Sequence, residues 1–180
     1  MSPTHNTGVK LVIYKKIVEG DLSKFTATSN FSPTGGGARD LRFSPANEFF
    51  AAFNRMFSYN NDGTYLWGYF SWHNHAPTEV SIYPPTNARP NEVRISCIHE
   101  CFPQEVIPES ADDCILLIVL DNTGRINPYF TSQYSLQHDN WHPDIKNPIL
   151  AGLTAPRNRR TTAMGIVDIE NGGHYTNGRI

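Results

Sequence analysis

The sequence predicts a mostly β domain, either a barrel or a sandwich, with few helices. Short stretches rich in β-branched and aromatic residues recur at near-regular spacing, and breaks that contain Pro, Asn or Gly separate them. Only one segment has a strong helical period. Many short strands with little helix are typical of barrels and sandwiches. With 180 residues, 39% of them hydrophobic, the chain can build a core of its own.

The first third of the chain contains one strand, one loop and the helix. Residues 9–18 are rich in Val and Ile and predict a strand, and residues 24–37 are polar, end in three glycines and predict a loop. Ser44 followed by Pro45 has the form of an N-cap and a first helical residue, so we expect a helix over 45–57. Its apolar stripe, which we expect in the core, is Phe49, Phe50, Phe53, Met56 and Phe57.

The remainder alternates turns with strands up to about residue 150. We expect a turn at 60–63 and strands at 65–72, 79–83, 92–98, 114–120 and 125–130. The last two strands flank Asp121-Asn122-Thr123-Gly124, a hairpin signal in which Asn and Gly can take positive φ. Beyond residue 150 the chain becomes basic and less periodic. We therefore expect one domain over 1–150, and over 151–180 a C-terminal margin or linker toward a catalytic domain outside this chain.

Charge is distributed unevenly along the chain. The net charge is −2, from 15 basic and 17 acidic residues, and taken alone it argues against a nucleic-acid-binding protein. However, residues 95–124 carry six acidic residues and no Lys or Arg, so the rest of the chain is mildly basic. This segregation is compatible with a protein that presents one face to a polyanion, and equally with an ordinary soluble enzyme.

The predicted compartment is the cytoplasm, with no membrane partner. The longest nearly uncharged apolar run, residues 114–120, is far shorter than the roughly 20 residues of a bilayer span, and the N-terminus has no signal-peptide pattern. Three cysteines, an odd number without a C-x-x-C pair, predict reduced thiols.

Motifs for catalysis or metal binding are weak. His73-Asn74-His75 lacks the spacing of a nuclease motif, and Pro143-Asp144-Ile145-Lys146 lacks the second acid of a Mg²⁺ nuclease site. Cys97, His99 and Cys101 would share one face of a strand but have no fourth zinc ligand. We therefore predict no catalytic residue, metal or cofactor. Two alternatives stay open: a small metal-dependent hydrolase that uses Asp144, Lys146 and the histidines, and a protein-interaction module whose aromatic strand 65–72 packs on a partner.

Two segments combine residue types that read DNA bases. Residues 34–43 join three glycines to Arg39 and Arg42, and residues 89–96 join Arg, Asn and Glu where a loop meets a strand. Arg pairs with guanine O6 and N7, Asn with adenine, and Glu can accept from cytosine N4, so this set suits readout of base edges in the major groove. Solvated strand ends with ordinary surface ion pairs are the alternative.

These two segments resemble the N-terminal effector domain of the EcoRII-type restriction endonucleases. The family pattern is a Thr-Gly-Gly loop, a short Leu-containing strand that ends at a Pro, a helix, and later a run Arg-Asn-Glu-Lys-Arg-Ile-Thr. The first part matches Thr34-Gly35-Gly36 through Leu41 to Pro45, and the second matches residues 89–96, in the same order and at similar spacing. Three positions depart from the pattern: Pro90 is inserted, Val93 replaces a lysine, and Gly37 replaces a polar residue.

The resemblance implies a seven-stranded, B-three-like pseudobarrel with flanking helices. It also implies a monomeric module without catalytic activity that binds duplex DNA at a CC(A/T)GG-like site, within a larger protein that carries a catalytic nuclease domain. Two arms would contact the major groove. The residues that the resemblance assigns to DNA binding are Gly36, Gly37, Arg39, Asp40 and Arg42 in the first arm, and Arg89, Asn91, Glu92 and Arg94 in the second.

Overall fold

In a computed structural model of the chain, residues 8–26 and 39–179 are described, and they form two compact units. Unit 1 combines residues up to 17 with those from 112 onward, and unit 2 comprises the residues between them. Each unit contains an antiparallel sheet of five strands, and within the described residues both sheets are open. The prediction of a mostly β protein with a few helices is therefore confirmed. No helix in these residues is long and apolar enough to cross a membrane.

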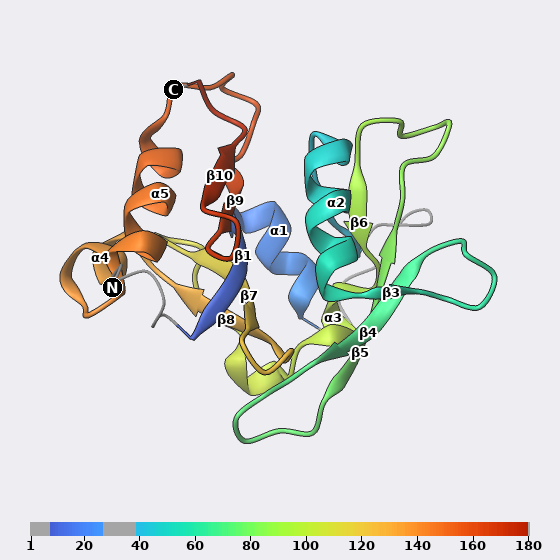
Figure 1. The fold of residues 1–180 in the computed structure, drawn as a ribbon. Helices are drawn as coiled ribbons and strands as arrows, with labels where there is room; N and C mark the ends of the chain where they lie inside the picture. Colours follow the sequence, from blue (N-terminus) through green and yellow to red (C-terminus); the bar gives the residue numbers. More distant parts are fainter. Residues whose placement is uncertain (1–7, 27–38, 180) are drawn as a thin grey trace. The chain divides into compact units, whose positions relative to one another are not determined.

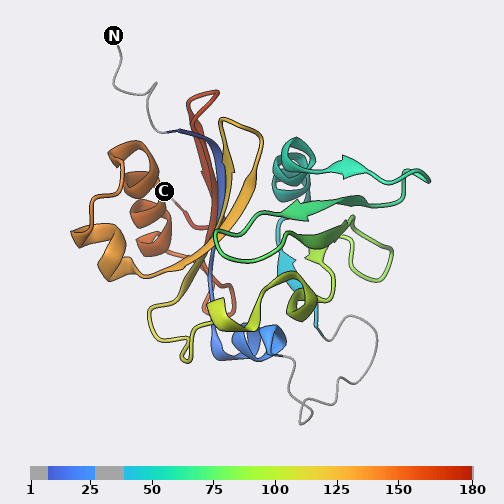
Figure 2. The ribbon, with the colours of Figure 1, turned by 90° about the horizontal axis from the view of Figure 1, so that it is seen from below.

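The sheet of unit 1 is covered by two helices on one face. α4 (Gln133–His138) and α5 (Pro143–Thr154) lie together on one side of this sheet (Figure 2), where Leu136 and Ile149 pack with Val12 and Val167 of the strands. The strand order is β10-β9-β1-β7-β8. The strands are β1 (Val9–Lys16), β7 (Ile115–Asp121), β8 (Ile126–Thr131), β9 (Met164–Asp168) and β10 (Gly173–Thr176).

The C-terminal stretch differs from the expected margin or linker. β9 pairs with the central strand β1, and β10 pairs with β9, so residues 164–176 belong to the sheet of unit 1. Gly and His contribute little strand propensity here. Their pairing with the buried strand β1 determines the structure instead, and a single sequence does not reveal such a long-range contact.

The sheet of unit 2 has the order β2-β6-β5-β4-β3. Its strands are β2 (Leu41–Phe43), β3 (Ser58–Tyr59), β4 (Leu66–Phe70), β5 (Thr78–Tyr83) and β6 (Val93–Ile95). Three helices accompany them: α1 (Glu19–Phe25), α2 (Ala46–Met56) and α3 (Ile98–Cys101). A 3-10 turn follows at Gln104–Val106.

Helix α2 confirms the one helix predicted from the sequence, and it lies along one face of the unit 2 sheet (Figure 1). The rings of Phe49 and Phe53 pack on Phe43 of β2, with centroids 5.4 and 5.1 Å apart. The expected Ser44 cap is not formed: the N-cap residue is Pro45, and the Asn91 side-chain oxygen accepts a hydrogen bond from the Ala46 N–H at 3.3 Å. A residue 45 positions away thus caps the helix.

Residues alternate between the two faces of the unit 2 sheet. Leu41, Phe43, Val93, Ile95 and Ile82 are at most 1% exposed and form the face that packs in the core. Their neighbours along each strand point to the opposite face, because successive side chains in a strand alternate. We call this opposite side the outer face. It carries Arg42, Arg94, Tyr83, Ser81, Glu79, Trp67 and Tyr69.

Candidate functional site

The two segments selected from the sequence meet on the outer face. β2 pairs antiparallel with β6, and Arg42 lies directly opposite Arg94. The apolar neighbours Val93 and Ile95 are fully buried, so Arg94 between them points away from the core. Two arginines that are 52 positions apart in sequence are therefore cross-strand neighbours on one surface.

Arg94 is held in place by two contacts. Its Nη1 lies 3.3 Å from Oδ2 of Asp40, and its guanidinium carbon lies 5.7 Å from the centroid of the Tyr83 ring, within cation–π range. Asp40 itself is only 4% exposed, and its other carboxylate oxygen accepts a hydrogen bond from the Cys97 N–H at 3.4 Å. The geometry therefore gives Asp40 the task of orienting Arg94 rather than contacting a ligand.

Glu92 lies between two further arginines. Its Oε2 is 3.7 Å from Nε of Arg42 and 3.8 Å from Nη1 of Arg89. Arg89 is brought back toward β6 by a tight turn, in which the main chains of Thr86 and Arg89 hydrogen-bond to each other at 3.0 and 3.2 Å. Both ion-pair distances exceed hydrogen-bond length, so the carboxylate attracts the two guanidinium groups without satisfying their N–H donors.

Unsatisfied polar atoms are concentrated in this cluster. Four buried side-chain atoms here make no hydrogen bond: Nε of Arg42, Nη1 of Arg89, Oε2 of Glu92 and Nε of Arg94. A buried donor or acceptor without a partner costs about 1–3 kcal/mol, so native proteins rarely keep several together without a function. We refer to Asp40, Arg42, Arg89, Glu92 and Arg94 as the charged cluster.

Arg39 and Asn91, two further predicted site residues, make contacts with other parts of unit 2. Nη1 of Arg39 donates to the Thr26 carbonyl at 2.8 Å, and the Asn91 amide oxygen caps α2. Both residues therefore have structural contacts within the folded chain, which the prediction of base readout did not include. Gly36 and Gly37 lie outside the described residues.

Aromatic side chains continue the outer face beyond the charged cluster. Tyr83 is the cross-strand neighbour of Arg94, and its ring stacks on Tyr65 with centroids 4.9 Å apart. Trp67 and Tyr69 follow Tyr65 on β4 at alternate positions and are exposed. Aromatic residues at the alternate positions 65, 67 and 69 were the sequence signal for this surface. Nothing near Tyr83 in the sequence indicated its place beside Arg94.

The Cys97, His99 and Cys101 group does not have the expected geometry. β6 ends at Ile95, Cys97 takes a left-handed backbone (φ 48°), and α3 begins at Ile98, so the three side chains do not share the face of a strand. Burial raises the pKa of the Cys101 thiol to about 12. Within the described residues no three His, Cys, Asp or Glu side chains lie close enough to hold a metal ion.

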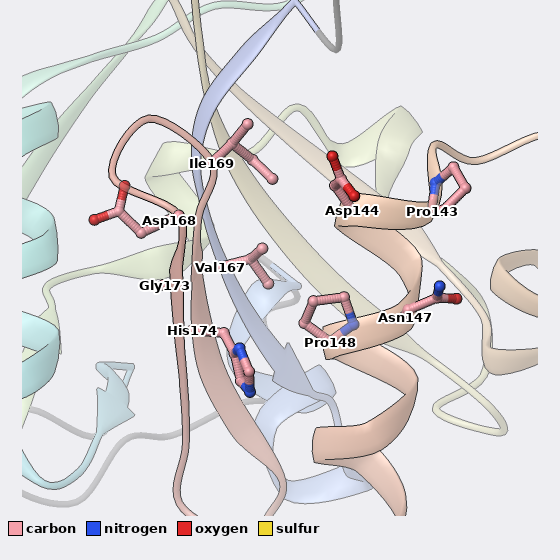
Figure 3. Close-up of a pocket in the computed structure, with 10 residues that line it drawn as sticks. Pro143, Asp144, Asn147, Pro148, Val167, Asp168, Ile169, Gly173 and His174 are labelled. Atoms are coloured by element: carbon pink, nitrogen blue, oxygen red, sulfur yellow. The ribbon is translucent and has the colours of Figure 1, made fainter. Parts of the chain in front are cut away.

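The segment Pro143–Lys146 starts helix α5 instead of forming a loop. Nδ1 of His142 accepts from the Asp144 N–H at 3.2 Å and caps the helix. Asp144 borders a pocket of about 300 Å³ between α5 and the β9–β10 turn (Figure 3), whereas Lys146 does not line it. Residues two apart on a helix do not face each other, so Asp144 and Lys146 do not form the paired arrangement of a Mg²⁺ nuclease.

Comparisons with known proteins supply no relative. No family model, no curated protein and no solved structure matches this chain. The residues of the outer face and the resemblance in the sequence are therefore the observations that bear on function.

Proposed function

We propose that this chain is a sequence-specific duplex DNA-binding module of the EcoRII-type effector kind, which recognises a CC(A/T)GG-like site and leaves cleavage to a separate nuclease domain. The observation that carries the proposal is the charged cluster: residues from both predicted arms form one group in which four buried polar atoms lack hydrogen bonds. The seven-stranded pseudobarrel of that family is the finer arrangement that the proposal entails.

β2 and β6 are the two strands at one edge of the unit 2 sheet, and this position supports a role in the major groove. The groove is wide enough to admit a two-stranded β ribbon, and side chains opposite each other on such a ribbon lie about 5 Å apart. Arg42 and Arg94 occupy such opposite positions. In the proposed complex each guanidinium donates to O6 and N7 of a guanine, and a recognition site that contains adjacent guanines presents two such partners.

Asp40 and Glu92 act on the arginines differently. Asp40 is nearly buried and fixes the Arg94 guanidinium before any ligand arrives, which lowers the conformational entropy lost on binding. Glu92 has about a third of its side chain exposed and can exchange its long ion pairs with Arg42 and Arg89 for the amino group of a cytosine. A carboxylate facing DNA is repelled by phosphates, so its position favours such a specific contact over general attraction.

The test is selection from a pool of randomised duplexes, followed by affinity measurements on the selected and a scrambled duplex over a range of salt concentrations. Arg94→Ala should weaken the selected site by about 1–3 kcal/mol and change scrambled DNA much less. Arg125→Ala removes the same charge from a hairpin turn of unit 1 while keeping its main-chain hydrogen bond to Asp121, and it is the matched control. Equal losses for Arg94→Ala on both duplexes would exclude base readout.

Glu92→Ala and Mg²⁺ incubation complete the test. Removing the negative charge strengthens sequence-independent attraction while deleting the cytosine contact, so we expect relaxed specificity with equal or higher affinity for scrambled DNA. Incubation of the CC(A/T)GG duplex with Mg²⁺ should leave both strands intact. Cleavage that Asp144→Ala abolishes would replace this proposal with the hydrolase alternative.

A further inference from the structure

The outer face changes from charged to aromatic along the sheet. One row of cross-strand neighbours runs from Arg42 through Arg94 to Tyr83, and the stacked pair Tyr83 and Tyr65 extends it to β4. A second row pairs Ser81 with Trp67, and a third pairs Glu79 with Tyr69. Arginines thus occupy one side of the surface and aromatic rings the other, and the Arg94–Tyr83 contact joins them.

The aromatic side keeps its rings accessible. Trp67 is 38% exposed and Tyr69 is 51% exposed, although both lie on β4, which has a hydrogen-bonded strand on each side. Their centroids are 5.9 Å apart and the ring planes meet at 69°, so the two rings do not cover each other's faces. Exposed aromatic groups of this size cost solvation free energy, which a stacking ligand would recover.

We propose that Trp67 and Tyr69 bind unpaired bases of a DNA single strand that continues from the duplex held by the charged cluster. The inference rests on the proposed function for the position of the duplex. Every base has a π face, so aromatic side chains on a sheet bind single strands with little sequence preference. The charged cluster contains three arginines and two carboxylates, and its net positive charge attracts the phosphates of such a strand.

Charge argues for this occupant over a lipid surface. Glu79 lies opposite Tyr69 on the same face, and Ser81 lies opposite Trp67, so the cross-strand partners of these two rings include no Lys or Arg of the kind that anchors an aromatic patch to anionic headgroups. Glu79 also restricts the path of the strand, because its carboxylate repels phosphates beside Tyr69. The bases therefore stack on Trp67 and Tyr69 while the backbone runs on the side of the charged cluster.

The experiment compares one cognate duplex in three forms: blunt, with a six-nucleotide 3′ thymidine overhang, and with the same overhang at the 5′ end. A free thymidine dodecamer is the fourth probe, and fluorescence anisotropy reports each affinity. For the wild type we expect one overhang to bind about tenfold or more tightly than the blunt duplex. Trp67→Ala should remove most of that gain and leave blunt binding within about twofold, and Trp67→Phe should keep much of it.

The matched control is the double variant Tyr129→Ala/Tyr134→Ala, because these tyrosines of unit 1 are 49% and 67% exposed. It should leave the overhang gain unchanged, and circular dichroism should give the wild-type spectrum for all variants. Glu79→Gln should raise affinity for the overhang duplex.

Three results would overturn the inference: no gain from either overhang in the wild type, a gain that Trp67→Ala leaves intact, or a loss of equal size in the control. A change from dimer to monomer in Trp67→Ala, with the gain unaltered, would assign the face to a second copy of the chain. Failure of the proposed function gives a different pattern, since the blunt duplex would not bind while the dodecamer still bound in a Trp67-dependent way.

Discussion

The two sheets of this protein use their faces differently. In unit 1, strand β7 buries six consecutive residues from Ile115 to Leu120, so both faces of the strand are apolar. In unit 2, β6 buries Val93 and Ile95 and places Arg94 between them on the other side. A strand buried on both faces contributes stability only, whereas an alternating strand keeps one face available for a ligand. The difference is the reason for proposing the DNA-binding surface in unit 2.

Polar groups inside the two units show the same contrast. Tyr14 of β1 is 1% exposed in unit 1, and burial raises the pKa of its phenol, which therefore stays neutral. Gly152 and Gly165 leave the space that its ring occupies. Arg94 of unit 2 is charged, and one of its guanidinium nitrogens lacks a hydrogen bond. In the described part of unit 1 the other buried atoms without hydrogen bonds, Oδ2 of Asp144 and Nε of Arg157, lie near opposite ends of α5, whereas in unit 2 four such atoms belong to the charged cluster.

The largest effect should follow from filling the space beside Tyr14. A Cβ at Gly165 would overlap the Tyr14 ring and the Tyr175 carbonyl, and backbone cannot yield as a flexible side chain can. We expect Gly165→Ala to lower the free energy of unfolding by about 3 kcal/mol, at the upper end for overpacking. Gly173→Ala on β10 is the control, since nothing lies within 4 Å of its Cβ. Urea unfolding of both variants measures the difference, and equal stabilities would contradict the account of Tyr14.

A second effect should appear in DNA binding rather than in the core. If Asp40 acts only by orienting Arg94, Asp40→Asn should weaken binding to the selected duplex about tenfold, or about 1.4 kcal/mol. The same change in the Arg94→Ala background should then cost almost nothing. This double-mutant cycle separates positioning from a general loss of stability, which would weaken both backgrounds alike. Additive losses would mean that Asp40 contributes independently of Arg94.

Local signals in the sequence predicted much of the fold. Helix α2 was predicted because its apolar stripe repeats with helical period, and strands β1, β7 and β8 because they are apolar runs bounded by turn residues. α1, α3, α4 and α5 were missed. In α5 an internal Pro148 obscures the pattern, and the helix is secured by the His142 cap and by packing of Ile145 and Ile149. Tertiary contacts override local propensity at such places.

The site was predictable in composition but not in arrangement. The sequence placed Arg42 and Arg94 in two segments of similar chemistry, yet their direct opposition depends on the β2–β6 register, which a single chain does not reveal. Asn91 shows what the sequence could not predict. Its amide suited base readout, but it caps α2 because Ala46 lies within reach in the folded unit.

A smaller, pH-dependent effect is expected at the hairpin between β7 and β8. Partial burial alone would raise the pKa of Asp121, but hydrogen bonds from Thr123, Arg125 and Asn127 outweigh it and hold the pKa below its usual value. A lowered pKa means that the contribution to stability is present at neutral pH and is lost as the pH falls through the folded-state pKa. Asp121→Asn should therefore cost less than about 1 kcal/mol at neutral pH.

Urea unfolding at neutral pH and near pH 3 tests this sign. The wild type and Asp121→Asn should converge in stability at the lower pH, because the wild-type carboxylate then becomes protonated and loses its advantage as an acceptor. Thr123→Ala should show part of the same convergence, since its hydroxyl donates to the same oxygen at 2.6 Å. A gap that widens on acidification would contradict the assignment of these hydrogen bonds as the cause.

The smallest expected effect is on the rate at which cysteines are alkylated, and it can be compared between the two units. Burial raises the pKa of Cys101 to about 12 and that of Cys114 to about 11, whereas Cys97 is exposed. Because the thiolate is the nucleophile, iodoacetamide near pH 8 should label Cys97 first, as mass spectrometry can verify.

The Cys97 N–H donates to the carboxylate that holds Arg94, so duplex DNA bound at the charged cluster should slow this labelling several-fold. Cys114 in unit 1 should react at its own slow rate with or without DNA. Unchanged labelling of Cys97 under saturating cognate duplex would move the DNA away from the charged cluster.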